Sequence, residues 1–180
     1  HLKAWVEYLK SRSKGYITDY YYYGDWVLPY PETVQPDNIF VSTAYLFWHL
    51  KEMKKIAGIV GNKADIALYK KDIELCRKAI NDKYFDAETK NYSRGTQTEN
   101  ALAVSLGICA DEHATEVAEN VYKDVVARNY HCTSGNVGYR HVFYVLAEND
   151  HADAVVKILK NPEYPGWGYM IASGATSVWE

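Results

Sequence analysis

Aromatic and acidic side chains lie next to one another in the segments of this 180-residue sequence that read as connectors. Asp25 and Trp26 are adjacent, and an indole beside a carboxylate can stack on a sugar ring while the carboxylate binds two hydroxyl groups. Trp167 and Tyr169 alternate with glycines, which suits a pocket wall where the backbone approaches a ligand. A second interpretation stays open: the aspartate orders its loop and the rings plug the end of a helical bundle.

The elements that would position these residues are helices of two kinds. Some runs are apolar almost all round, and others carry apolar residues on one face only, at spacings of three and four. The first kind comprises 38–60 (in its first half), 97–110 and 138–147, and the second comprises 64–85, 112–129 and 151–160, with 4–11 as the end of a further one. No stretch alternates with period two, so we expect no sheet.

Strict alternation of the two kinds predicts three helical hairpins, each with an inner and an outer helix. Short polar links join the helices within a hairpin, and longer connectors join one hairpin to the next. The long connectors are 14–37, 90–96, 130–137 and 161–180. In an up-and-down array every second connector lies at the same end, so we expect these four to share one face and the short links to share the other.

The long connectors hold about a third of the chain but half of its aromatic residues. The sequence has 17 tyrosines and 5 tryptophans against only 4 phenylalanines, so rings with a polar group are preferred. Rings and polar side chains collected on rigid helices are typical of a functional site. Sugars need this mixture, because their C–H faces stack on rings and their hydroxyl groups need donors and acceptors. The alternative is that tyrosine-rich loops only close the end of a bundle.

Composition excludes several classes of protein. The net charge of −3 and the pI near 6.1 argue against a nucleic-acid partner, and no apolar stretch is long enough for a membrane span. Cys76, Cys109 and Cys132 fit neither a disulfide framework nor a zinc site, so we expect no metal and no cofactor. The compartment stays open between the bacterial cytoplasm and the periplasm or exterior.

Several segments resemble the α-L-rhamnosidase family of glycoside hydrolases, in the same order along the chain. Residues 164–170 (YPGWGYM) and 174–180 (GATSVWE) are similar to the family's YPSWGYM and GATTIWE. Residues 24–26 match its GDW loop, residues 95–103 (GTQTENALA) are similar to GTQTANALAL, and residues 131–138 (HCTSGNVG) resemble HLTTGFVGT. Together these segments span most of residues 16–180.

The resemblance implies an all-α fold, the (α/α)6 barrel, in which six helical hairpins form a closed ring with the sugar at one end. This chain would supply about three hairpins and the tail of a fourth. We therefore expect residues 1–180 to be a single region, the C-terminal half of a catalytic barrel within a larger chain. The partners implied are a rhamnose-containing carbohydrate and the remainder of the same enzyme.

The resemblance also implies roles for individual residues. Glu180 matches the general base of an inverting mechanism that uses two carboxyl groups, and the family's general acid lies in an upstream segment that has no counterpart in these 180 residues. We expect the substrate to be bound by Asp25, Trp26, His131, Trp167, Tyr169 and Trp179. Gln97 and Asn100 are expected instead to brace the start of an inner helix.

Two other classes of function remain compatible with the sequence. One is a non-catalytic helical-repeat module that binds a carbohydrate or a protein with the same aromatic face. The other is an (α/α)6 glycosidase with a different sugar specificity. The family pattern has a more apolar sequence at the start of the last inner helix, where this chain has Tyr139, Arg140 and His141. This difference leaves the chemistry of the sugar subsite open.

Overall fold

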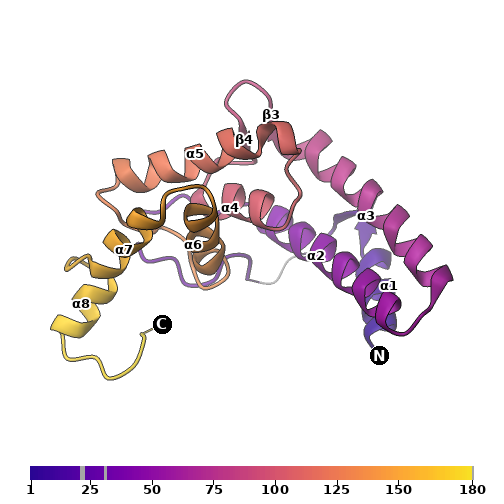
Figure 1. Ribbon diagram of the computed structural model, residues 1–180, viewed down its shortest axis with the longest axis horizontal. Coiled ribbons are helices and arrows are strands. Elements are labelled where there is room, and N and C mark those ends of the chain that lie inside the picture. The colour runs from indigo at the N-terminus through magenta and orange to yellow at the C-terminus, as the bar shows by residue number, and fades with distance from the viewer. Residues whose placement is uncertain (21–22, 31, 180) are drawn as a thin grey trace. The chain divides into compact units, whose positions relative to one another are not determined.

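The computed structural model describes residues 1–20, 23–30 and 32–179, and the chain is predominantly helical (Figure 1). It divides into two compact units. The first comprises residues 1–24 and 37–85, and the second comprises residues 25–36 and 86–180. Among the described residues, none of the helices combines the length and the apolar character needed to cross a bilayer.

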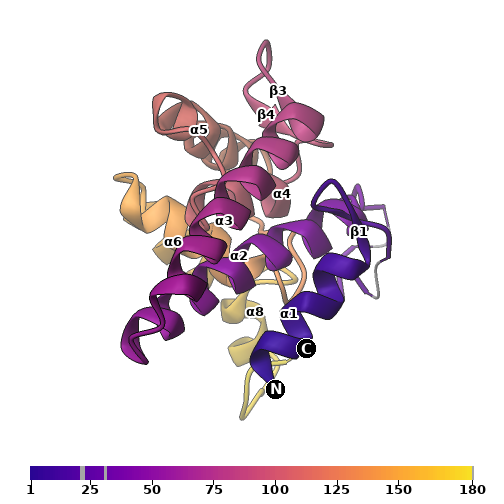
Figure 2. The same ribbon diagram turned by 90° about the vertical axis from the view of Figure 1, so that its right-hand side faces the viewer.

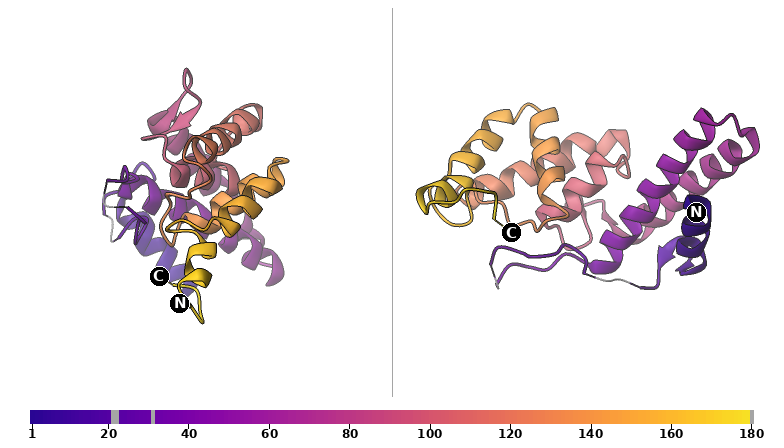
Figure 3. Two further views of the ribbon diagram at one scale, coloured as in Figure 1. Left: turned by 90° about the vertical axis from the view of Figure 1, so that its left-hand side faces the viewer. Right: turned by 90° about the horizontal axis from the view of Figure 1, so that it is seen from below.

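The first unit is a helical hairpin with a shorter helix packed on it. It contains α1 (Leu2–Ser11), the two-residue strands β1 (Ser13–Lys14) and β2 (Ile17–Thr18), α2 (Asn38–Ile59) and α3 (Lys63–Tyr84). The strands pair antiparallel, with Ser13 opposite Thr18, and both α1 and β2 pack on α2 (Figure 2). The antiparallel arrangement of α2 and α3 is visible from below in Figure 3.

Capping side chains fix where the two long helices begin. The Asp37 carboxylate accepts the backbone N–H groups of Ile39 and Phe40, at 2.8 and 3.0 Å, and so caps α2. The Asn62 side chain caps α3 in the same way after a turn at Gly61, whose φ is 73°. Both starts agree with the predicted helices at 38 and 64 to within one residue.

Burial confirms the predicted difference between these two helices. Helix α2 buries residues from several sides, whereas α3 buries a narrower set at helical spacing. The core residues include Phe40, Leu46, Phe47 and Leu50 from α2, and Tyr69, Cys76 and Ile80 from α3. Helix α2 is therefore the inner member of its hairpin and α3 the outer one.

The second unit contains two further helical hairpins and a short last helix. Its helices are α4 (Gln97–Ser105), α5 (Asp111–Ala127), α6 (Tyr139–Glu148), α7 (Ala152–Lys160) and α8 (Trp167–Ala172). The short strands β3 (Phe85–Asp86) and β4 (Asn91–Tyr92) pair in a hairpin where the first unit passes into the second. Helix α4 packs against α5 and α6, and α6 packs against α7 (Figure 1).

The core of this unit is formed mainly by small and branched apolar side chains. Its fully buried members include Ala101 from α4, Val121 and Val125 from α5, and Val142 and Leu146 from α6. Every residue of α4 from Gln97 to Ala103 is buried, so α4 is enclosed as its apolar pattern predicts. A capping box joins Thr96 and Glu99 at its start.

Three features differ from the sequence-based expectations. The helix predicted over 97–110 ends at Ser105, because the chain reverses at Gly107, whose φ of 74° is a left-handed conformation that ends a helix. Helix α8 lies within the stretch that was expected to be a connector. The strands β1 to β4 are four two-residue segments, where no strand was expected.

The long connectors of the second unit meet at one end of its helices, as predicted. The Thr133 N–H donates to the Gln97 side chain at the start of α4, and the Asn161 side chain donates to the Asn129 carbonyl after α5. The short links at 106–110 and 149–151 follow the opposite ends of these helices. The placement of the 61–63 link relative to this end remains a prediction, because that link belongs to the first unit.

Candidate carbohydrate-binding site

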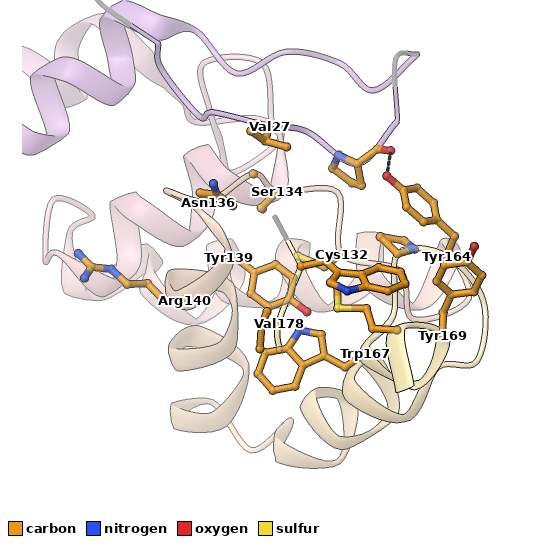
Figure 4. Close-up of a pocket in the computed structure, with 15 residues that line it drawn as sticks. Val27, Cys132, Ser134, Asn136, Tyr139, Arg140, Tyr164, Trp167, Tyr169 and Val178 are labelled. Carbon is orange, nitrogen blue, oxygen red and sulfur yellow. Dashed lines mark hydrogen bonds between the residues drawn. The ribbon is translucent and has the colours of Figure 1, made fainter. Parts of the chain in front are cut away.

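A cavity of about 270 Å3 lies at this end of the second unit (Figure 4). Three stretches of chain form it: residues 27–29, the segment 132–140 that leads into α6, and the segment 164–179 that contains α8. The lining is mostly apolar and aromatic, with a few polar groups, which is the usual character of a site for a small organic ligand. Its volume lies near the lower end of the range for such sites.

Three of the residues predicted to bind substrate line this cavity: Trp167, Tyr169 and Trp179. The Tyr169 ring makes edge-to-face contacts with the rings of Tyr164 and Trp179, at centroid distances of 5.8 and 6.3 Å. Figure 4 shows Trp167 and Tyr169 on the α8 side of the cavity and Tyr139 on the α6 side. The structure therefore brings these rings together from two helices.

The two glycines that alternate with these rings are required by the packing of the backbone. A Cβ atom at Gly166 or Gly168 would overlap the carbonyl oxygen of Asn161 at the end of α7. Only glycine allows the backbone to pass this close to the Asn161 carbonyl. Gly166 directly precedes α8, which begins at Trp167, and Gly168 is the second residue of that helix. The two glycines thus hold Trp167 and Tyr169 against the end of the helical core.

The polar part of the lining is supplied by Ser134, Asn136 and Arg140. The Arg140 Nε–H donates to His141 Nε2 at 3.2 Å, so Nε2 is the acceptor nitrogen of the imidazole. The proton of the neutral ring is therefore on Nδ1, which donates to Ser105 Oγ at 2.7 Å. Burial of the imidazole, together with the charge of Arg140, lowers the pKa of His141 to about 4. A neutral His141 therefore links Arg140 to α4.

Two further titratable groups of the wall, the Cys132 thiol and the Tyr139 phenol, stay uncharged. Burial raises the pKa of the Cys132 thiol to about 12 and also raises the pKa of the Tyr139 phenol. Cys132 is therefore a protonated, buried thiol and not a nucleophile. Among the described residues, no group of three or more potential metal ligands is present.

Asp25 does not line the cavity, although its segment does. The residue is 3% exposed, and its carboxylate accepts four hydrogen bonds, from the backbone N–H groups of Gly135, Val137 and Gly138 and from the hydroxyl of Thr98. Both oxygens are engaged within the protein. The geometry thus favours the loop-ordering role over direct contact with sugar hydroxyl groups.

Trp26 and His131 lie near the cavity and outside its lining. The Trp26 side chain is 47% exposed, and its carbonyl accepts the Asn136 N–H at 2.8 Å. His131 Nδ1 lies 2.7 Å from the Arg128 carbonyl, and its Nε2 lies 3.5 Å from the Glu163 carboxylate. Its ring also meets Tyr30 edge-on at 6.5 Å, so in this structure His131 braces the loop behind the cavity.

Glu180, the predicted general base, lies outside the described residues. Gln97 and Asn100, which were expected to brace the start of an inner helix, join the start of α4 to two loops: Gln97 accepts the Thr133 N–H and Asn100 accepts the Tyr92 N–H, at 3.0 and 2.9 Å.

Sequence reasoning did not single out Tyr139, Asn136 or Ser134 as site residues. Tyr139 is the first residue of an apolar helix, where the pattern indicates a core position. Its place after a segment with two glycines, Gly135 and Gly138, is the one signal that could have marked it. The other two precede this helix in the loop 131–138, whose resemblance to a family motif marked the loop, although only His131 was singled out within it.

A model of a known protein family matches the chain over its whole length. Residues 1–180 match the model described as the bacterial alpha-L-rhamnosidase 6 hairpin glycosidase domain. The chain belongs to this family. Its all-α architecture is accordingly part of the six-hairpin (α/α)6 fold, of which it supplies three hairpins.

Curated relatives and solved structures agree with this membership. An alpha-L-rhamnosidase of Formosa agariphila is 27% identical over 183 residues, which cover 99% of this chain and 20% of that protein. The structure of Streptomyces avermitilis alpha-L-rhamnosidase complexed with L-rhamnose has a TM-score of 0.91 at 26% identity, over 99% of this chain and 17% of that one. The alpha-L-rhamnosidase from Dictyoglumus thermophilum gives 0.90 at 32% identity, over 99% and 21%. The chain thus spans about a fifth of the length of these relatives.

Proposed function

We propose that this chain is the C-terminal half of the catalytic barrel of an enzyme that removes terminal α-L-rhamnose from glycosides or polysaccharides. The observation that carries the proposal is the cavity, whose volume suits one sugar unit and whose walls combine rings with a few polar groups. The Streptomyces relative that shares this fold was solved with L-rhamnose, which supports the choice of sugar. The partners are then a rhamnose-containing carbohydrate and the rest of the same enzyme.

The aromatic lining fits the shape of this sugar. Rhamnose carries a methyl group where most hexoses carry a hydroxymethyl group, so part of its surface is apolar. Trp167, Tyr169 and Trp179 offer rings for the C–H faces, and Asn136 and Arg140 offer donors for hydroxyl groups. Trp26 and His131, close to the cavity, complete the proposed set of substrate-binding residues.

The reaction in this proposal is hydrolysis with inversion at the anomeric carbon. The Glu180 carboxylate takes a proton from a water molecule, whose oxygen bonds to that carbon while the glycosidic C–O bond breaks. A general acid elsewhere in the enzyme donates a proton to the departing oxygen. In such enzymes the two carboxyl groups stand about 6.5–9.5 Å apart, which leaves room for the water.

Replacement of Glu180 by glutamine in the complete enzyme tests this assignment. The amide keeps the size of the side chain but cannot accept the proton from water. We expect kcat for an aryl α-L-rhamnoside to fall by about 10²–10⁴-fold while KM changes little. Glu148→Gln, an exposed position at the far end of α6, is the matched control and should leave kcat unchanged.

Two further measurements separate this proposal from its alternatives. The sugar released by the wild-type enzyme should appear first as the β anomer in an NMR time course, and azide should partly restore turnover of the Glu180→Gln variant by forming a β-rhamnosyl azide. A near-normal kcat for this variant would contradict the role of Glu180. Binding of rhamnosides without any turnover by the complete enzyme would indicate a non-catalytic module.

A further inference from the structure

The carboxylate of Asp25 is the point at which three segments around the cavity join. Asp25 Oδ1 accepts the N–H groups of Val137 and Gly138 at 3.0 and 2.9 Å, and Oδ2 accepts the Gly135 N–H at 2.9 Å and the Thr98 hydroxyl. The donors belong to α4 and to the loop that ends at α6. A buried carboxylate with four donors is firmly held, since charged acceptors form the stronger hydrogen bonds.

The loop around this carboxylate has no room for side chains at two positions. A Cβ atom at Gly135 would overlap the Trp26 carbonyl oxygen, and one at Gly138 would overlap Thr98 Oγ1 and approach Asp25 Oδ2 to 2.9 Å. The N–H groups of Val137 and Gly138, which lie directly before the first residue of α6, point at the carboxylate, and the positive end of the helix dipole favours a negative charge at this place. The loop is thus shaped to receive this particular acid.

The backbone is strained two residues after Asp25. Val27 has a φ of 57°, a left-handed conformation that a β-branched residue rarely adopts. Val27 itself lines the cavity, and the hydrogen bond between the Asn136 N–H and the Trp26 carbonyl fixes the residue before it. Strain of this kind persists only where the surroundings impose it, and it occurs preferentially at ligand sites.

We infer that Asp25 is a positioning residue that sets substrate affinity by holding two walls of the cavity in register. One wall is residues 27–29, and the other is the segment 134–140 with Ser134, Asn136 and Arg140. Asp25 itself contacts no substrate and takes no proton in the reaction. The inference rests on the proposed function for its kinetic consequence, while its structural part stands on the hydrogen bonds alone.

The Asp25→Asn variant of the complete enzyme tests the inference. The amide cannot accept at both positions, so at least one buried N–H of the loop loses its partner and the wall shifts. We expect KM for an aryl α-L-rhamnoside to rise about tenfold with a change in kcat of less than about threefold. A variant that is only partly folded would instead lower the apparent kcat and leave KM unchanged. Asp153→Asn, on the exposed side of α7, is the control.

A matched pair at Thr98 gives a second, milder test. Thr98→Ser keeps the hydroxyl donor and should retain the wild-type KM, whereas Thr98→Val removes one of the four donors and should raise KM by about threefold. Equal KM values for the two variants would contradict the inference. This pair also decides the question if Asp25→Asn does not fold.

Hydrogen exchange provides a readout that does not depend on activity. In Asp25→Asn the amides of residues 134–138 should exchange at least tenfold faster, while the amides of α5 should exchange as in the wild type. Unchanged exchange in this loop would overturn the inference even if the enzyme is a rhamnosidase. Absence of rhamnosidase activity in the wild type, with faster exchange in the variant, would instead overturn the proposed function and leave the structural role of Asp25 intact.

Discussion

At the scale of single residues, close packing of the backbone beside an aromatic residue decides whether its ring lines the cavity. Trp167 lies between Gly166 and Gly168, which pack against the Asn161 carbonyl. This packing fixes the backbone position from which the Trp167 side chain reaches the cavity wall. Tyr144, by contrast, lies on α6 with 59% of its surface exposed and lines no cavity. The two aromatic residues therefore provide a matched comparison of ring function.

We predict that Trp167→Ala in the complete enzyme raises KM for an aryl α-L-rhamnoside about tenfold, because the C–H face of the sugar loses the apolar surface that it buries on the ring, at roughly 25 cal/mol per Å2. The change in kcat should be smaller, since stacking is made in the ground state as well as in the transition state. Tyr144→Ala should leave both constants unchanged. Equal effects of the two variants on KM would contradict a substrate contact by Trp167.

Residue-level prediction from sequence succeeded where the signal was local. The alternation of glycines and rings at 166–169 marks the cavity wall directly. The sequence left open whether Asp25 binds a sugar or orders its loop, because its donors at Gly135, Val137 and Gly138 lie more than 100 residues away along the chain. Only the fold shows that this carboxylate has no oxygen available for a sugar.

At the scale of elements, α6 connects the cavity to the core. Its first residues, Tyr139 and Arg140, line the cavity, and the next residue, His141, joins it to Ser105 on α4. His141 is 4% exposed, and burial lowers its pKa to about 4. The attachment of α6 to α4 at this point therefore depends on a neutral imidazole.

We predict that the local stability of α6 falls as the pH falls from about 6.5 to 4. In this window the imidazole binds a proton when α6 opens but not while it is folded, so the open form gains protons and stability decreases by up to about 1.4 kcal/mol per pH unit. The measurement is the free energy of exchange of the α6 amides, corrected for intrinsic rates. The slope should be smaller in His141→Gln, and an identical slope in both proteins would contradict the assignment.

Element boundaries show where periodicity is a sufficient guide. The starts of α2, α3 and α4 follow from capping side chains and apolar spacing that are visible in the sequence. The end of α4 does not follow from apolar periodicity, because Leu106 and Ile108 continue the pattern while Gly107 reverses the chain. The two-residue strands could not be predicted at all, since pairs this short leave no pattern in the sequence.

At the scale of the whole molecule, the chain supplies three of the six hairpins of its family's fold. Helix α1 carries three large apolar side chains with about half of their surface exposed, namely Leu2, Trp5 and Tyr8. Exposed apolar residues in such a group are typical of a surface that meets other protein. We expect further helices of the same enzyme to cover this face of α1.

Because the chain supplies only part of its family's fold, we also make a prediction about the activity of the isolated 180 residues. The isolated 180 residues should not hydrolyse an aryl α-L-rhamnoside, because the family's acid-bearing motif has no counterpart in this sequence. Protonation of the leaving oxygen contributes about 10²–10⁴-fold to such reactions, and its loss adds to the loss of the other hairpins. The measurement compares the release of nitrophenol by the purified 180-residue chain and by the complete enzyme at equal concentration. Turnover by the short chain within tenfold of the complete enzyme would place a general acid among these residues. It would contradict our proposal that the two catalytic carboxyl groups are divided between this chain and the rest of the enzyme.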